Sequence, residues 1–164
     1  MSLTKAPASR HLQGLCVTIL LLGALPQILH GQLASPLFKN PQVPLVVHTV
    51  EGSKIYLKTV VVSTPEDLSQ GLMHVRYLPA NVTMLFLYER PRIASMWMKN
   101  THIPLDMWWV DVNMTIRHIV HRTTPHSLES VAYDKPVRAV IEINAGLSRL
   151  LGISVGSKIE FDTP

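Results

Sequence analysis

Residues 54–62 of the chain read KIYLKTVVV, a run rich in β-branched side chains in which apolar and polar residues partly alternate. Both features are typical of a half-buried β-strand. Similar short runs recur along the chain, and turn-forming residues separate them. We predict further strands over residues 82–88, 93–99, 107–111, 115–121, 137–143 and 158–161. The fold class is therefore predicted to be mainly β, a compact antiparallel sandwich or barrel.

Two short helices are expected between the strands. Thr64 can cap a helix over about residues 65–76, and the acidic residues of its first turn favour the positive end of the helix dipole. Asn144 can cap a second helix over about residues 145–151, which Gly152 would end. Both helices are too short to change the β-rich class.

The first 31 residues are predicted to form a signal peptide. Lys5 and Arg10 precede residues 15–25 (LCVTILLLGAL), an uncharged apolar run that contains the only cysteine. A spanning helix needs roughly 20 apolar residues, so we expect no stable membrane span after cleavage. Cleavage within residues 31–35 would place the protein in the periplasm or outside the cell. An uncleaved N-terminal anchor is the alternative.

The remaining chain is predicted to hold a single domain. Residues 32–53 contain several prolines and are interpreted as a linker with a possible edge strand, and residues 54–164 as one β-rich domain. The formal net charge is +4, and Lys5 and Arg10 of the leader supply half of it. The net charge of the remaining chain is too low for a surface that binds nucleic acid, so no nucleic-acid partner is expected.

The densest group of reactive side chains lies in residues 97–107, WMKNTHIPLDM. This loop joins two predicted strands, and loops held by rigid strands often carry binding sites. The candidate binding residues here are Trp97, Lys99, Asn100, Thr101 and Asp106. We expect the Trp97 ring to be packed within a strand and the four polar residues to form one cluster. The alternative is a structural turn in which Asn100 and Thr101 bond the backbone.

Glu142 and Asn144 are two further candidate binding residues. Glu142 alternates with isoleucines on a predicted strand, and Asn144 follows at the end of that strand. Their alternatives are a solvated strand face for Glu142 and a helix cap for Asn144.

Neither a metal ion nor a cofactor is expected. His118 and His121 stand three apart on a predicted strand, so they point to opposite faces. Met96 and Met98 share a face and could hold a soft cuprous ion, but such methionines more often fill a core. The sequence has no glycine-rich phosphate loop and no HExxH helix.

Residues 55–161 resemble the family of domains of unknown function numbered 192. The resemblance rests on the string WMKNT-x-IPLD at residues 97–106, GLM at 71–73 and EINAG at 142–146. It implies a compact, largely β fold that is often exported, and no established reaction, ligand or cofactor. The chain departs from the family pattern at Val75, Thr83 and Ser157, where arginine, glycine and aspartate are usual.

Two functions follow as the main competing hypotheses, and a purely structural, partner-binding role is a third. The first is an exported binding or accessory module of the cell envelope. Its partner would be a small molecule, a glycan or an envelope protein, held in a cleft lined by an aromatic ring and polar groups. The alternative is a hydrolase or lyase that acts on an envelope polymer. That enzyme needs two carboxylates, Asp106 and Glu142, converging in one pocket.

Overall fold

The computed structural model describes residues 35–162, so the predicted signal peptide lies outside the described residues. Its elements are α2 (Pro36–Lys39), β1 (Gln42–His48), β2 (Lys54–Val62), α3 (Pro65–Gln70), β3 (Val82–Arg92), β4 (Ser95–Met96), β5 (Leu105–Val110), β6 (Ile116–Val120), β7 (Val131–Ala132), β8 (Val137–Asn144), α4 (Leu147–Leu150) and β9 (Lys158–Phe161). The predicted β-rich class is confirmed, and the strands at 54–62 and 158–161 match the prediction to the residue. Within residues 35–162, no helix is long and apolar enough to cross a membrane.

Seven strands form one sheet in the order β6-β5-β8-β3-β2-β1-β9, and β4 pairs with β7 in a second small sheet. Neighbours in the large sheet run antiparallel, except β2 and β3, which run parallel. The chain from β2 to β3 passes through α3, which supplies the crossover that a parallel pair requires.

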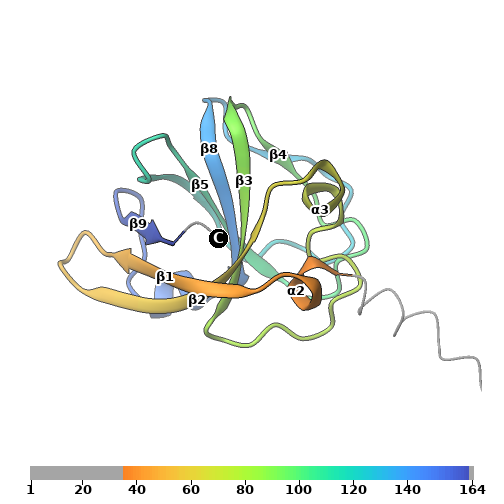
Figure 1. Cartoon of the computed structure of the whole chain (residues 1–164), viewed down its shortest axis with the longest axis horizontal. Helices are drawn as coiled ribbons and strands as arrows, with labels where there is room; N and C mark the ends of the chain where they lie inside the picture. Colours follow the sequence, from red (N-terminus) through yellow and green to blue (C-terminus); the bar gives the residue numbers. More distant parts are fainter. Residues whose placement is uncertain (1–34, 163–164) are drawn as a thin grey trace, which may run out of the picture.

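The large sheet curls into a half-barrel (Figure 1). A bridge joins Thr115, just before β6, to Lys158 of β9. The amide of Ile159 also donates to the carbonyl oxygen of Met114 at 2.8 Å. The contact between β6 and β9 therefore protects edges that a flat sheet would leave open.

Both faces of the sheet are buried. The inner core, inside the curl, includes Leu45, Trp108 and Ile141. The outer core includes Met107, Trp109 and Val140 and is covered by the connections before β3, before β5 and after β6. Successive side chains of a strand alternate between faces, so the adjacent Trp108 and Trp109 are each fully buried in a different core.

The linker prediction for residues 32–53 is wrong for the described part of that range. Ser35 caps α2, and its hydroxyl donates to the carbonyl oxygen of Gly71 at 3.0 Å. β1 pairs with β2 on one side and β9 on the other, so it is an interior strand and not an edge strand. The missing amide of Pro44 is tolerated because β9 pairs only with residues 45–48.

Both central helices are shorter than their predictions. α3 ends at Gly71, whose φ of 47° lies in the left-handed region, and a Cβ there would come within 3.0 Å of the Phe86 ring. A tight turn at this point positions the next residues against the sheet. α4 is capped by Gly146 and not by Asn144.

Candidate functional site

Glu142 lies on β8 near the middle of the sheet, between Met84 of β3 and Met107 of β5. Its side chain points to the outer face, shares that face with Val140, and is only 4% exposed. Among the described residues, Oε2 of Glu142 has no hydrogen-bond partner. Burial raises the pKa of Glu142 to about 8, so the carboxyl group is mostly protonated at pH 7.

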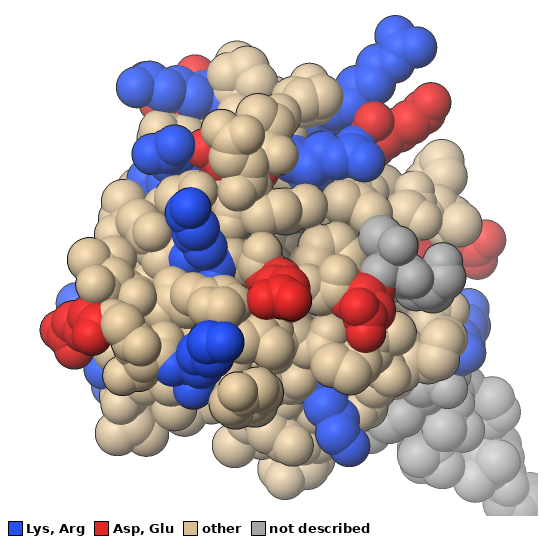
Figure 2. Space-filling model, turned by 60° about the vertical axis from the view of Figure 1, so that its left-hand side comes forward, with Lys and Arg blue, Asp and Glu red and all other residues tan. Residues whose placement is uncertain are grey.

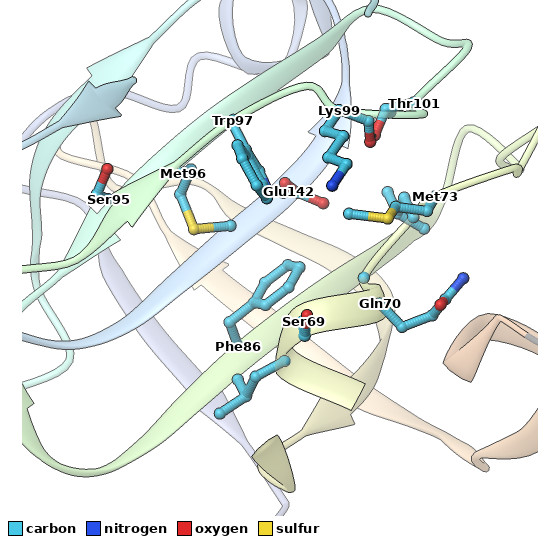
Figure 3. A pocket seen from close by; sticks show the side chains of 13 residues that line it. Ser69, Gln70, Met73, Phe86, Ser95, Met96, Trp97, Lys99, Thr101 and Glu142 are labelled. Atoms are coloured by element: carbon cyan, nitrogen blue, oxygen red, sulfur yellow. The ribbon is translucent and has the colours of Figure 1, made fainter. Parts of the chain in front are cut away.

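A cavity of about 90 Å³ opens over this carboxyl group (Figure 3). One wall is the end of α3 with the turn that follows it, residues 68–73, and Phe86 of β3 stands beside it. The opposite wall is the segment 95–101. In Figure 3 the Glu142 carboxyl group lies between the side chains of Trp97 and Lys99.

Trp97 separates this cavity from a second hollow. Its ring lines both, and Leu128 and Ser130 border the second one. The Nζ atom of Lys99 lies 5.0 Å from the centre of the Trp97 ring, within the range of a cation–π interaction. The prediction of a buried Trp97 within a strand is wrong, because β4 ends at Met96 and the side chain is 48% exposed.

Asn100 and Thr101 form a turn beside the cavity. Asn100 has a φ of 55° and is exposed, and its carbonyl oxygen accepts from the amide of His74 at 2.8 Å. The buried Thr101 lines the cavity, but its hydroxyl donates to the carbonyl oxygen of Lys99 at 3.2 Å. The first contact ties residues 99–101 to the connection before β3, and the second holds them from within the turn.

Asp106 does not join this group. It is fully buried on the inner face, where its carboxylate accepts from the backbone amides of Arg122 at 2.9 Å, Gly146 at 3.0 Å and Ser148 at 3.2 Å. Burial works to raise the pKa of Asp106, but the hydrogen bonds from Ser148, Arg122 and Gly146 outweigh it and hold the pKa below its usual value. The expected cluster of Lys99, Asn100, Thr101 and Asp106 is therefore wrong.

Asn144 also makes a structural contact. Its amide donates to the carbonyl oxygen of Leu78 at 2.7 Å, which ties the end of β8 to the connection before β3. Of the seven residues that the sequence proposed, the cavity brings together Trp97, Lys99, Thr101 and Glu142. It leaves out Asn100, Asp106 and Asn144.

Nine lining residues were not among the sequence candidates for binding: Leu68, Ser69, Gln70, Gly71, Leu72, Met73, Phe86, Ser95 and Met96. GLM at residues 71–73 was noticed only as part of a motif. The signal that the sequence offered was Glu142 itself, the single acidic residue in the run VRAVIEI. The structure adds that this strand is buried on both faces, which makes the acid unusual.

The residues described, 35–162, contain no group of three or more histidine, cysteine or acidic side chains that could hold a metal ion. His118 instead stacks on Tyr133, with the ring centres 5.4 Å apart.

Three comparisons relate the chain to known proteins. The model of the family DUF192, described as "Uncharacterized ACR", matches residues 46–161, which confirms the resemblance in the sequence. Among curated proteins, none matches the chain.

Two crystal structures are similar in fold and sequence. A protein described as a "putative transcription regulator" from Sinorhizobium meliloti 1021 is 34% identical, with a TM-score of 0.73, over 74% of this chain and 95% of that one. A protein of unknown function from Novosphingobium aromaticivorans DSM 12444 is 30% identical, with a TM-score of 0.72, over 79% of this chain and 95% of that one.

Proposed function

The chain belongs to the DUF192 family of uncharacterised proteins, and we propose that it is an exported domain that binds a ligand in the cavity over Glu142. It would act as a binding or accessory module of the cell envelope, in the periplasm or outside the cell. Export is proposed from the basic start and apolar run of residues 1–31.

The observation that carries the binding proposal is the Oε2 atom of Glu142, which has no partner within residues 35–162 and lies beneath an open cavity. A buried polar group without a partner costs about 1–3 kcal/mol of stability. Such a cost is typical of functional sites, where a ligand supplies the missing partner. The half-exposed Trp97 at the mouth offers a surface for the rest of that ligand.

The enzyme alternative receives no support from this arrangement. Asp106 and Glu142 point to opposite faces of the sheet, so they cannot act on one substrate as an acid–base pair. Among the described residues, Glu142 is the only acidic side chain lining the cavity.

A role in nucleic-acid binding is not proposed either. On the face in Figure 2, Lys and Arg side chains stand apart from one another and are interspersed with Asp and Glu. Proteins that bind nucleic acid usually present a continuous basic patch. The description of the Sinorhizobium protein as a transcription regulator is therefore not extended to this chain.

Ligand capture tests the binding proposal. The folded protein is incubated with envelope extract and washed, and the compounds released on denaturation are identified by mass spectrometry. Trp97→Ala is expected to lose the compounds that the wild type retains. It should lower the free energy of unfolding by only about 1 kcal/mol, against about 3–5 for a fully buried tryptophan, because the ring is half exposed.

Tyr56→Ala is the matched control, because it removes an exposed aromatic ring from β2, away from the cavity. It should retain the same compounds. A wild type that retains nothing, or a Trp97→Ala variant that retains as much, counts against a binding site here.

The export proposal has its own test. Sequencing of the N-terminus after expression with its native leader should give a first residue between 32 and 36. An intact Met1 on a membrane-bound form would show that the leader is an anchor.

A further inference from the structure

We infer that the ligand of this cavity carries an ammonium group, primary or methylated, which pairs with the Glu142 carboxylate and lies against the Trp97 ring. This inference rests on the proposed binding function and names the chemical class of the ligand.

The first argument comes from the unmet hydrogen-bonding need at the floor of the cavity. Oε2 of Glu142 is buried without a partner in the described part of the chain, and both strands beside Glu142 place a methionine opposite it. Methionine donates no hydrogen bond, so neither cross-strand neighbour can satisfy the carboxylate. A ligand that donates hydrogen bonds and carries a positive charge supplies what the protein leaves out.

The second argument comes from the walls. Phe86 and Trp97 contribute aromatic rings, and Met73 and Met96 contribute thioethers (Figure 3). Aromatic faces attract cations, and polarizable methionine side chains adapt to irregular apolar groups such as methylated nitrogen. Aromatic rings around a carboxylate are a common arrangement in sites for organic ammonium ions.

The third argument is that Trp97 already holds an ammonium group. The Nζ atom of Lys99 lies over the ring, 5.0 Å from its centre, at the mouth of the cavity. Lys99 is exposed and can turn into solvent. The ligand would take the place of this side chain, so Lys99 acts as a competitor and not as a ligand-binding group.

Binding should release a proton. Glu142 must ionise to pair with a cation, and its raised pKa keeps it mostly protonated at pH 7. The charged or titratable groups facing it are Lys99 at the mouth and Tyr88 of β3, whose pKa burial raises to about 12. Tyr88 therefore keeps its proton between pH 6 and 9. Affinity should therefore rise about tenfold from pH 7 to pH 9.

Calorimetric titration of the folded protein with three kinds of probe tests the inference. The cations are choline and butylammonium, the neutral probe is 3,3-dimethylbutan-1-ol, which has the shape of choline, and the anion is 3,3-dimethylbutanoate. At least one cation should bind tenfold or more tightly than the other two kinds. Repeating the titration in buffers of different ionisation enthalpy should show that about one proton is released.

Two substitutions should have opposite effects. Glu142→Gln should weaken cation binding at least tenfold, and Lys99→Met should strengthen it several-fold by removing the competitor. Glu160→Gln and Lys54→Met, exposed residues of β9 and β2 outside the cavity, are matched controls and should change nothing. Glu142→Gln removes a buried ionisable group, so denaturation curves are expected to show that it stays folded.

Three results would overturn the inference: equal binding of the neutral probe, preference for the anion without proton release, or weaker cation binding by Lys99→Met. If envelope compounds are still retained in a Trp97-dependent way, the binding function stands and only the ligand class is wrong. If nothing is retained and no probe binds, the proposed function is wrong as well.

Discussion

Raising the pH from about 4.5 to 8 is expected to lower the free energy of unfolding by about 4 kcal/mol through Glu142 alone. Folded Glu142 keeps its proton up to a pKa of about 8, whereas the unfolded chain releases it near the ordinary glutamate pKa of 4.5. Between these values the folded state binds more protons than the unfolded state, so stability falls as the pH rises. The contribution becomes constant only above about pH 9, where folded Glu142 is also ionised. Urea denaturation at pH 5, 6, 7 and 8 measures the change.

Glu142→Gln isolates this effect, because glutamine fills the same space without titrating. The variant should show a nearly flat profile over this range and exceed the wild type at pH 8 by several kcal/mol. Asp106 and Asp111 have lowered pKa values and titrate below this window. The lowered pKa of His102 acts near pH 6.5 with the opposite sign, but it is common to both proteins. Parallel profiles for the two proteins would show that Glu142 is not held protonated.

Asp106→Ala is expected to cost about 3–5 kcal/mol at pH 7. The substitution leaves three backbone amides, those of Arg122, Gly146 and Ser148, without their acceptor in a buried region. These bonds join β5 to the end of β6 and to the start of α4, so their loss should loosen the end of the half-barrel. Chemical denaturation gives the magnitude.

Asp111→Ala is the comparison for that substitution. Asp111 also accepts two backbone amides, from Asn113 and Thr115, but it lies in an exposed turn where water can replace it. Its loss should cost about 1 kcal/mol. Similar losses for the two variants would mean that Asp106 does not organise the fold. The Asp106 contribution should also disappear in acid, as the pH falls from 3.8 through the lowered pKa of the folded state.

The strands were predictable because β-branched runs and turn residues are local signals, as residues 54–62 and 158–161 show. The parallel pairing of β2 with β3 was not, because it depends on how the chain crosses over the sheet. α3 was predicted too long because apolar residues continue at helical spacing beyond Gly71. That residue instead turns the chain so that Leu72 and Val75 pack on the outer core.

The candidate site was also predictable only in part, because its local features could be found in the sequence and its long-range contacts could not. Glu142 could be proposed from an alternating strand, but the sequence favoured a solvated face because alternation does not show which segments cover that face. The connection that carries α3 and the segment 95–101 provide that cover. Asp106 was placed near Lys99 because they are close in the chain, whereas strand alternation sends Asp106 to the inner face.

The pairing of β1 with β9 also constrains how this protein acquires its structure. His48 and Glu160, 112 residues apart, approach within 2.9 Å across that pair. Contacts between such distant parts of a chain close a large loop, and a high contact order slows folding. During synthesis, β1 can pair with β9 only after β9 has been made. Late completion of the sheet would suit the proposed export, because a secretion channel threads an unfolded chain.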